Sequence, residues 1–163
     1  MNDVISPELA AELTRIGIFF FIVLLVIWLF FANTIRSTLK LIAKENQCIL
    51  PNQAWFLAIP FFNIYWNFEV ARRLSYSLNN EFYDRKIAVE EQPTLRAGLT
   101  YAWSYLVYNF PLPAFWRMLG MIVSLVYFIT YWFKINQYRV LLIEHNKWLE
   151  SEQNNLNRDA DEN

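Results

Sequence analysis

The sequence predicts an all-α, polytopic membrane helix bundle of four apolar helices, accompanied by amphipathic helices at the membrane surface. Three observations support this class: 56% of the 163 residues are apolar, only 18% are charged, and the charges gather between apolar blocks and at the chain ends. A chain of this length corresponds to one domain. We expect residues 1–150 to form that domain. Residues 151–163 are acidic and contain one leucine, so they should form a disordered tail.

The composition excludes several functional classes. Because 14 Lys and Arg are balanced by 15 Asp and Glu, we expect no nucleic-acid partner. Cys48 is the only cysteine and His145 the only histidine, so the chain offers neither a disulfide framework nor metal-ligand spacing. Three glycines are too few for a phosphate-binding glycine loop. We therefore expect no enzyme activity, no catalytic or metal-binding residue, and no cofactor.

The first apolar segment, at about residues 16–33, contains neither a charge nor an amide from Ile16 to Ala32. As a helix this stretch is about 25 Å long, which approaches the thickness of the hydrocarbon layer. A cleavable signal peptide is the competing interpretation. Residues 1–15 are net acidic rather than basic, and no small-x-small cleavage pattern follows. The segment is therefore interpreted as a membrane anchor.

The next segment, Thr34–Asn46, predicts an amphipathic helix with a basic stripe formed by Arg36, Lys40 and Lys44. A basic helix beside a membrane span lies at the bilayer surface, where its cations meet anionic headgroups. These three side chains are therefore candidate lipid-headgroup contacts. The alternative, that the stripe is a solvated face of a helix packed on the protein, has equal weight.

The second apolar segment, at about residues 54–71, is ambiguous. It is long enough to cross the membrane, but it contains Pro60, Asn63, Asn67 and Glu69. An acidic residue at a helix centre costs about 2.5–3.5 kcal/mol on insertion, and each Leu, Ile or Phe returns only about 0.3–0.6 kcal/mol. The segment is therefore either a span stabilised by neighbouring helices or a re-entrant or surface helix.

Positive charges favour the cytoplasmic side of a membrane. With four spans and the N-terminus inside, ten Lys and Arg lie inside and four outside; with a re-entrant second segment and the N-terminus outside, the split is twelve against two. A short internal sequence repeat favours the four-span model. Tyr65-Trp66 and Tyr131-Trp132 are each followed by an arginine at the same distance. Because of this repeat we predict four spans. Reporter fusions at residues 46 and 86 would distinguish the two models, because the two positions lie on opposite sides of the membrane only if the second segment crosses it.

The last two apolar segments, at about 97–110 and 114–134, are separated by Pro111 and Pro113. Two prolines this close remove two backbone donors and disfavour helix before each ring. They predict a tight turn between antiparallel helices. Before them, Leu74, Leu78 and Phe82 recur at helical spacing and predict a helix with one apolar side. After Lys134, the last helix should continue beyond the bilayer.

Polar and small residues lie on one stripe of the last apolar helix, among them Ser124, Tyr127 and Tyr131. With Asn63 and Asn67 they form a candidate polar seam inside the membrane. The seam is either one wall of a transport path or an interface that holds helices together. The interface has the greater weight, because amides and hydroxyls commonly join membrane helices.

Two small-xxx-small patterns permit close approach of helices. They are Gly98-x-x-x-Ala102 and Gly120-x-x-x-Ser124. In an antiparallel hairpin these two notches lie at different heights, so we expect each to receive a different helix, from this chain or from a second copy of it.

One motif carries a family resemblance. Trp55, Ile59-Pro60, Asn63 and Trp66 form the pattern W-x-x-x-I-P-x-x-N-x-x-W. It resembles an uncharacterised bacterial family of small integral membrane proteins, a domain of unknown function, that carries this pattern in the second helix of a bundle. The resemblance covers Thr34–Ile135. It implies a multi-pass protein of the bacterial inner membrane, and it implies no activity.

The leading hypothesis is a non-catalytic integral membrane protein with a structural or accessory role. Its partners would be the lipid bilayer and either other membrane proteins or a second copy of the chain. The alternative is a small transporter or channel component that uses the polar seam. A third hypothesis is binding of anionic lipids by the basic stripe.

Overall fold

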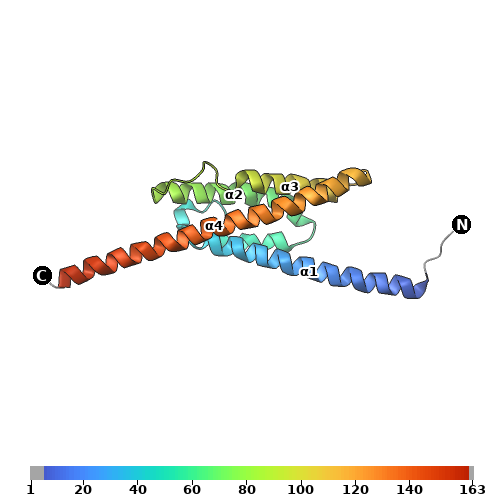
Figure 1. Ribbon diagram of the computed structural model, residues 1–163, viewed down its shortest axis with the longest axis horizontal. Coiled ribbons are helices and arrows are strands. Elements are labelled where there is room, and N and C mark those ends of the chain that lie inside the picture. Colours follow the sequence, from blue (N-terminus) through green and yellow to red (C-terminus); the bar gives the residue numbers. More distant parts are fainter. Residues whose placement is uncertain (1–5, 162–163) are drawn as a thin grey trace.

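The computed structural model describes residues 6–161, and within this range all regular structure is helical (Figure 1). The chain forms α1 (Pro7–Leu39), η1 (Lys44–Asn46), η2 (Pro51–Ala58), α2 (Phe62–Asp84), α3 (Leu95–Asn109) and α4 (Ala114–Asp161), where η denotes a 3₁₀ helix. The all-α class is confirmed. Two helices, α1 and α4, are long and apolar enough to cross a membrane, where the sequence predicted four.

The long helix α1 has two parts with opposite surroundings. It begins at Ser6, whose hydroxyl accepts a hydrogen bond from the Leu9 N–H at 3.3 Å, and Pro7 fits the first turn because no partner is needed for its nitrogen. Residues 7–24, which we call the arm, are all exposed. The base of α1, residues 31–39, buries Phe31, Ala32 and Ile35 among other side chains. Figure 1 shows the arm extending away from the other helices.

The predicted separate surface helix over Thr34–Asn46 is wrong. Instead, α1 continues without a break to Leu39, and a turn leads to the short η1. The apolar stripe expected there is buried, since Ile35 and Leu39 are 0% exposed and Ile42 is 3% exposed. The segment therefore packs on the protein with its apolar side.

The second apolar segment is a hairpin rather than a continuous span. Pro60 cannot donate a hydrogen bond and disfavours helix at Ile59, which is extended and ends η2. After a turn at residues 59–61, α2 runs back, and the Asn46 amide donates to the Asp84 carboxylate at 2.8 Å. The chain just before and just after this segment therefore lies together at one end of the molecule, as the re-entrant interpretation expects, and neither η2 nor α2 is among the two helices long and apolar enough to cross a membrane.

The packed side of α2 is the apolar side that its spacing predicts: Leu74, Leu78 and Phe82 are each 0% exposed. After the loop that follows α2, α3 and α4 form an antiparallel hairpin. Phe110 is extended and ends α3 before Pro111, as expected of a residue before proline.

The C-terminal half of α4 projects beyond the packed helices (Figure 1). Residues 151–161 continue α4, which corrects the prediction of a disordered tail; residues 162–163 lie outside the described range. The tail buries almost nothing, since residues 151–159 are exposed. An existing helix extends without a second nucleation cost, so a polar sequence can follow it as helix.

The core is centred on aromatic rings near the base of α1. Phe31 is 1% exposed and packs edge-on against four rings at centroid distances of 5.0–6.4 Å. Three of these rings come from α4 and one from α3: Phe128, Tyr131, Trp132 and Tyr101. The base of α1 is therefore held by the α3–α4 hairpin, and η2 packs along the same helix.

Candidate functional site

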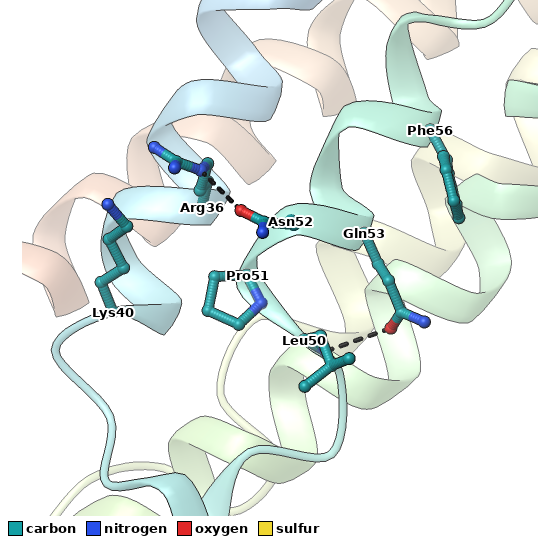
Figure 2. A pocket seen from close by; sticks show the side chains of 7 residues that line it. All are labelled: Arg36, Lys40, Leu50, Pro51, Asn52, Gln53 and Phe56. Carbon is teal, nitrogen blue, oxygen red and sulfur yellow. Dashed lines mark hydrogen bonds between the residues drawn. The ribbon is translucent and has the colours of Figure 1, made fainter.

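A basic groove lies between the last turn of α1 and the start of η2 (Figure 2). Its volume is about 570 Å³. The lining side chains come from both elements and from the residue before η2: Arg36, Lys40, Leu50, Pro51, Asn52, Gln53 and Phe56. The groove thus has a basic wall on α1 and a mixed polar and apolar wall on η2.

The two cations share the groove because they are four residues apart on one helix face. Arg36 donates from Nε to the Asn52 side-chain oxygen at 3.2 Å, and its guanidinium lies 5.9 Å from the centre of the Trp55 ring. Lys40 is exposed. No ion pair found among residues 6–161 includes either side chain, and no Asp or Glu lines the groove, so its lining carries a net positive charge.

The opposite wall is stabilised within η2. The Leu50 N–H donates to the Gln53 side-chain oxygen at 3.1 Å, and the Gln53 N–H donates to the Leu50 carbonyl at 2.9 Å. Leu50 is 62% exposed and Phe56 is 39% exposed. The wall therefore presents apolar side chains that are partly uncovered; Phe56 also packs edge-on against Phe62 and Trp66 of α2.

Lys44 lies outside this groove. It begins η1, beyond the turn that follows α1, and it is exposed. The structure therefore brings together two of the three side chains predicted to contact lipid headgroups, Arg36 and Lys40, and separates the third from them.

The candidate polar seam is mostly buried. Asn63 is 1% exposed, Asn67 5%, Ser124 7% and Tyr131 1%, whereas Tyr127 is 37% exposed and lies outside the packed interface. These values place four of the five predicted residues within the helix packing and leave the fifth on the surface.

The predicted meeting of α2 and α4 along this seam is not direct. The Asn63 amide donates to the Tyr105 hydroxyl of α3 at 3.4 Å, and the ring of Tyr101, also on α3, lies 6.4 Å from that of Tyr131. The tyrosines of α3 therefore lie between the asparagines of α2 and the stripe of α4. Sequence reasoning missed Tyr101 and Tyr105, although both lie four residues apart in an apolar segment.

The two small-residue notches are filled from within the chain. A Cβ atom on Gly98 would lie 2.8 Å from Ala71 Cβ and 2.9 Å from the Tyr131 ring. A Cβ atom on Gly120 would lie 3.0 Å from the Tyr108 nitrogen and from a Val107 methyl group. Ala102, the partner of Gly98 in its pattern, is 0% exposed, and Ser124, the partner of Gly120, is 7% exposed. Each notch thus receives a helix of the same chain, and the two do not serve each other, as predicted.

A buried acid at the opposite end of α2 was missed by the sequence analysis. Glu81 is 3% exposed; it accepts hydrogen bonds from the Ala43 N–H at 2.9 Å and the Asn46 amide at 3.0 Å, and it pairs with Arg85 at 2.7 Å. Arg85 in turn reaches the Asn146 side chain of α4 at 2.6 Å. This network joins the end of α1 to α2 and α4. Its signal in the sequence was the position of Glu81 on the apolar face, seven residues after Leu74.

The residues of the family-like motif build the η2–α2 hairpin. Trp55 belongs to η2, Ile59 and Pro60 form the turn, and Asn63 and Trp66 lie on α2. Trp66 donates from its indole nitrogen to the Gln53 carbonyl at 2.9 Å. The motif therefore spans a turn and two elements rather than a single second helix, which corrects the placement expected from the resemblance.

The described chain offers few groups with chemical reactivity. Within residues 6–161, no group of three or more His, Cys, Asp or Glu side chains could hold a metal ion. His145 lies 3.2 Å from Arg85, and Cys48 is exposed. The expected absence of enzyme activity and of a cofactor remains a prediction.

The resemblance inferred from the motif likewise remains a prediction. Comparisons with protein-family models, curated proteins and solved structures found no match to this chain.

Proposed function

We propose that the protein is a non-catalytic, multi-pass protein of the bacterial inner membrane with a structural or accessory role. In this proposal the arm of α1 binds another membrane protein or a second copy of the chain. The observation that carries the proposal is the complete exposure of residues 7–24, which are predominantly apolar beyond Arg15. An exposed apolar surface of this length is unfavourable in water, so it needs lipid or a protein partner around it.

The proposed topology has the N-terminus outside and three crossings, by α1, α3 and α4. The η2–α2 hairpin enters from the inside and returns to it, because its two ends meet through Asn46 and Asp84. Only Arg15 and Arg117 then lie outside, against twelve Lys and Arg inside. This charge distribution follows the positive-inside rule better than the four-span alternative does.

The proposal assigns the polar seam to helix packing. A transport path would need side chains that face water, whereas Asn63 and Tyr131 are each only 1% exposed and Gly98 packs closely against two helices. Buried amides and hydroxyls that contact neighbouring helices are the usual means of joining membrane helices. The burial values therefore support packing over transport.

Site-specific photo-crosslinking in native membranes tests the role of the arm. A photoreactive residue at Phe20, which is 60% exposed on the arm, should give a protein adduct, either of twice the chain mass or with another protein. The matched control is Ile122 on α4, which is 59% exposed and should react with lipid only. Lipid adducts alone at both positions would contradict binding through the arm.

A further inference from the structure

We propose that the basic groove binds the phosphate of one phospholipid headgroup, with an acyl chain of that lipid along the exposed apolar side of η2. The proposal rests on the membrane location proposed above. It names a ligand class for the groove, and it predicts a discrete site in which Arg36 and Lys40 act together, rather than a general attraction of the basic stripe to the membrane surface.

The charge of the groove fits a phosphate group. Arg36 uses its Nε for Asn52, and within residues 6–161 no hydrogen bond from its terminal nitrogens is found. Those nitrogens can therefore form the paired hydrogen bonds that guanidinium groups make with phosphate oxygens. Lys40, one helical turn further on, adds a second positive charge to the same wall (Figure 2). Asn52 holds Arg36 in place, which lowers the entropic cost of binding.

The position of the groove along α1 matches the headgroup layer. The apolar run of α1 ends at Ala32, and Arg36 follows four residues later, about 6 Å further along the helix axis. Trp55 lies against Arg36, and indole rings favour the boundary between headgroups and hydrocarbon. The cations are therefore placed where the phosphates of a surrounding leaflet would lie.

The apolar wall continues from the groove toward the membrane interior. Because η2 runs back along α1, its later residues lie deeper than its first ones. Phe56 is 39% exposed, Ile59 is 47% exposed, and Phe61 at the tip of the hairpin is 87% exposed. In this proposal the acyl chain lies against these exposed side chains while its phosphate lies at Arg36 and Lys40. Free phosphate would use only the basic wall.

Lipid binding can be measured by native mass spectrometry of the full chain in mild detergent after delipidation. With dioleoyl phosphatidylglycerol as the probe, the unmodified protein should retain one lipid. Changing Arg36→Gln together with Lys40→Gln should weaken binding by about tenfold or more, because charge-assisted contacts to the phosphate are lost. Lys40→Gln alone, at an exposed position, should give a smaller loss without affecting the fold.

Two matched variants separate the specific site from general attraction. Lys44→Gln removes the same charge outside the groove and should leave lipid retention unchanged. Phe56→Asn should weaken the lipid but not the binding of inorganic phosphate. Circular dichroism of each variant should match that of the unmodified protein, and equal lipid retention by the double variant and the Lys44 variant would overturn the proposal.

The remaining outcomes identify the source of the phosphate. Millimolar ammonium phosphate should not displace phosphatidylglycerol; displacement, together with no effect of Phe56→Asn, would show a site for free phosphate and overturn the lipid assignment. The membrane location is tested separately by retention of the chain in carbonate-washed membranes. Loss of that retention would refute the proposed function, whereas an unchanged lipid count in the groove variants would refute this inference alone.

Discussion

The arm and the base of α1 are both rich in apolar side chains, yet their surroundings are opposite. In the arm, Phe20 is 60% exposed, and a methyl group added to Gly17 would meet no atom within 4 Å. In the base, Phe31 is 1% exposed and lies among four aromatic rings. One helix therefore contains both an uncovered surface and part of the molecule's core.

The difference shows that hydrophobicity alone does not decide whether a membrane helix is covered by protein. Lipid satisfies an apolar side chain about as well as another helix does, so close packing and hydrogen bonds decide which surfaces meet. The base supplies both: Ala32 permits close approach, and the Thr34 hydroxyl accepts a hydrogen bond from the Trp132 indole at 3.0 Å. After Arg15, the arm has mostly bulky apolar side chains and no hydrogen-bonding side chain.

The largest effect should come from shortening the same residue type in each region. Phe31→Ala should destabilise the fold by about 3–5 kcal/mol, because it leaves a cavity among packed rings. Phe20→Ala should change the free energy of unfolding by less than about 0.5 kcal/mol, because this side chain is on the surface. Denaturation in detergent measures both. Equal losses of stability in the two variants would contradict the proposed difference between the arm and the base.

A glycine in each region gives a sharper test with a smaller change. Gly98→Ala should cost about 1–3 kcal/mol, because its methyl group would lie within 2.9 Å of Ala71 and Tyr131. Gly17→Ala meets nothing within 4 Å and should be neutral or stabilising by up to about 1 kcal/mol, since alanine favours helix. Thermal unfolding of the two variants compares them directly. A stabilising Gly98→Ala would show that α2, α3 and α4 are less closely packed than described.

The smallest effect concerns the water-facing edge of the packed region. Glu90 accepts hydrogen bonds from Lys134 at 2.8 Å and from Tyr138 at 2.9 Å, and these bonds lower the pKa of Glu90 below its ordinary value of 4.5. Burial, followed by the Glu90 bond, raises the pKa of Tyr138 from 10.0 to about 12. An exposed pair of this kind contributes about 0.2–1 kcal/mol.

The direction of each pH effect follows from these shifts. The Glu90 contribution is present above pH 4.5 and is lost as the pH falls through the lowered pKa, because the unfolded chain then binds the proton more readily. The Tyr138 contribution is present below pH 10.0 and is lost as the pH rises to about 12. Melting temperatures of the unmodified chain and of Glu90→Gln should converge on the acidic side; parallel curves there would contradict the assignment.

Much of the helical architecture was predictable because local signals decide it. The apolar run before Ala32, the prolines at 111 and 113, and the spacing of Leu74 and Leu78 each act over a few residues, and the structure has the corresponding helix, turn and buried face. Pro60 likewise predicted an interruption. Its consequence, a hairpin instead of a span, required contacts from elsewhere in the chain.

By itself, the sequence determined the helical class, the position of the breaks and which side of α2 is apolar, because backbone sterics and residue spacing act locally. Tertiary structure alone decided that Asn46 meets Asp84, that Glu81 is buried with Arg85, and that Arg36 and Lys40 share a groove from which Lys44 is excluded. These outcomes join residues from different elements. Their free energies depend on packing distances that no local pattern specifies.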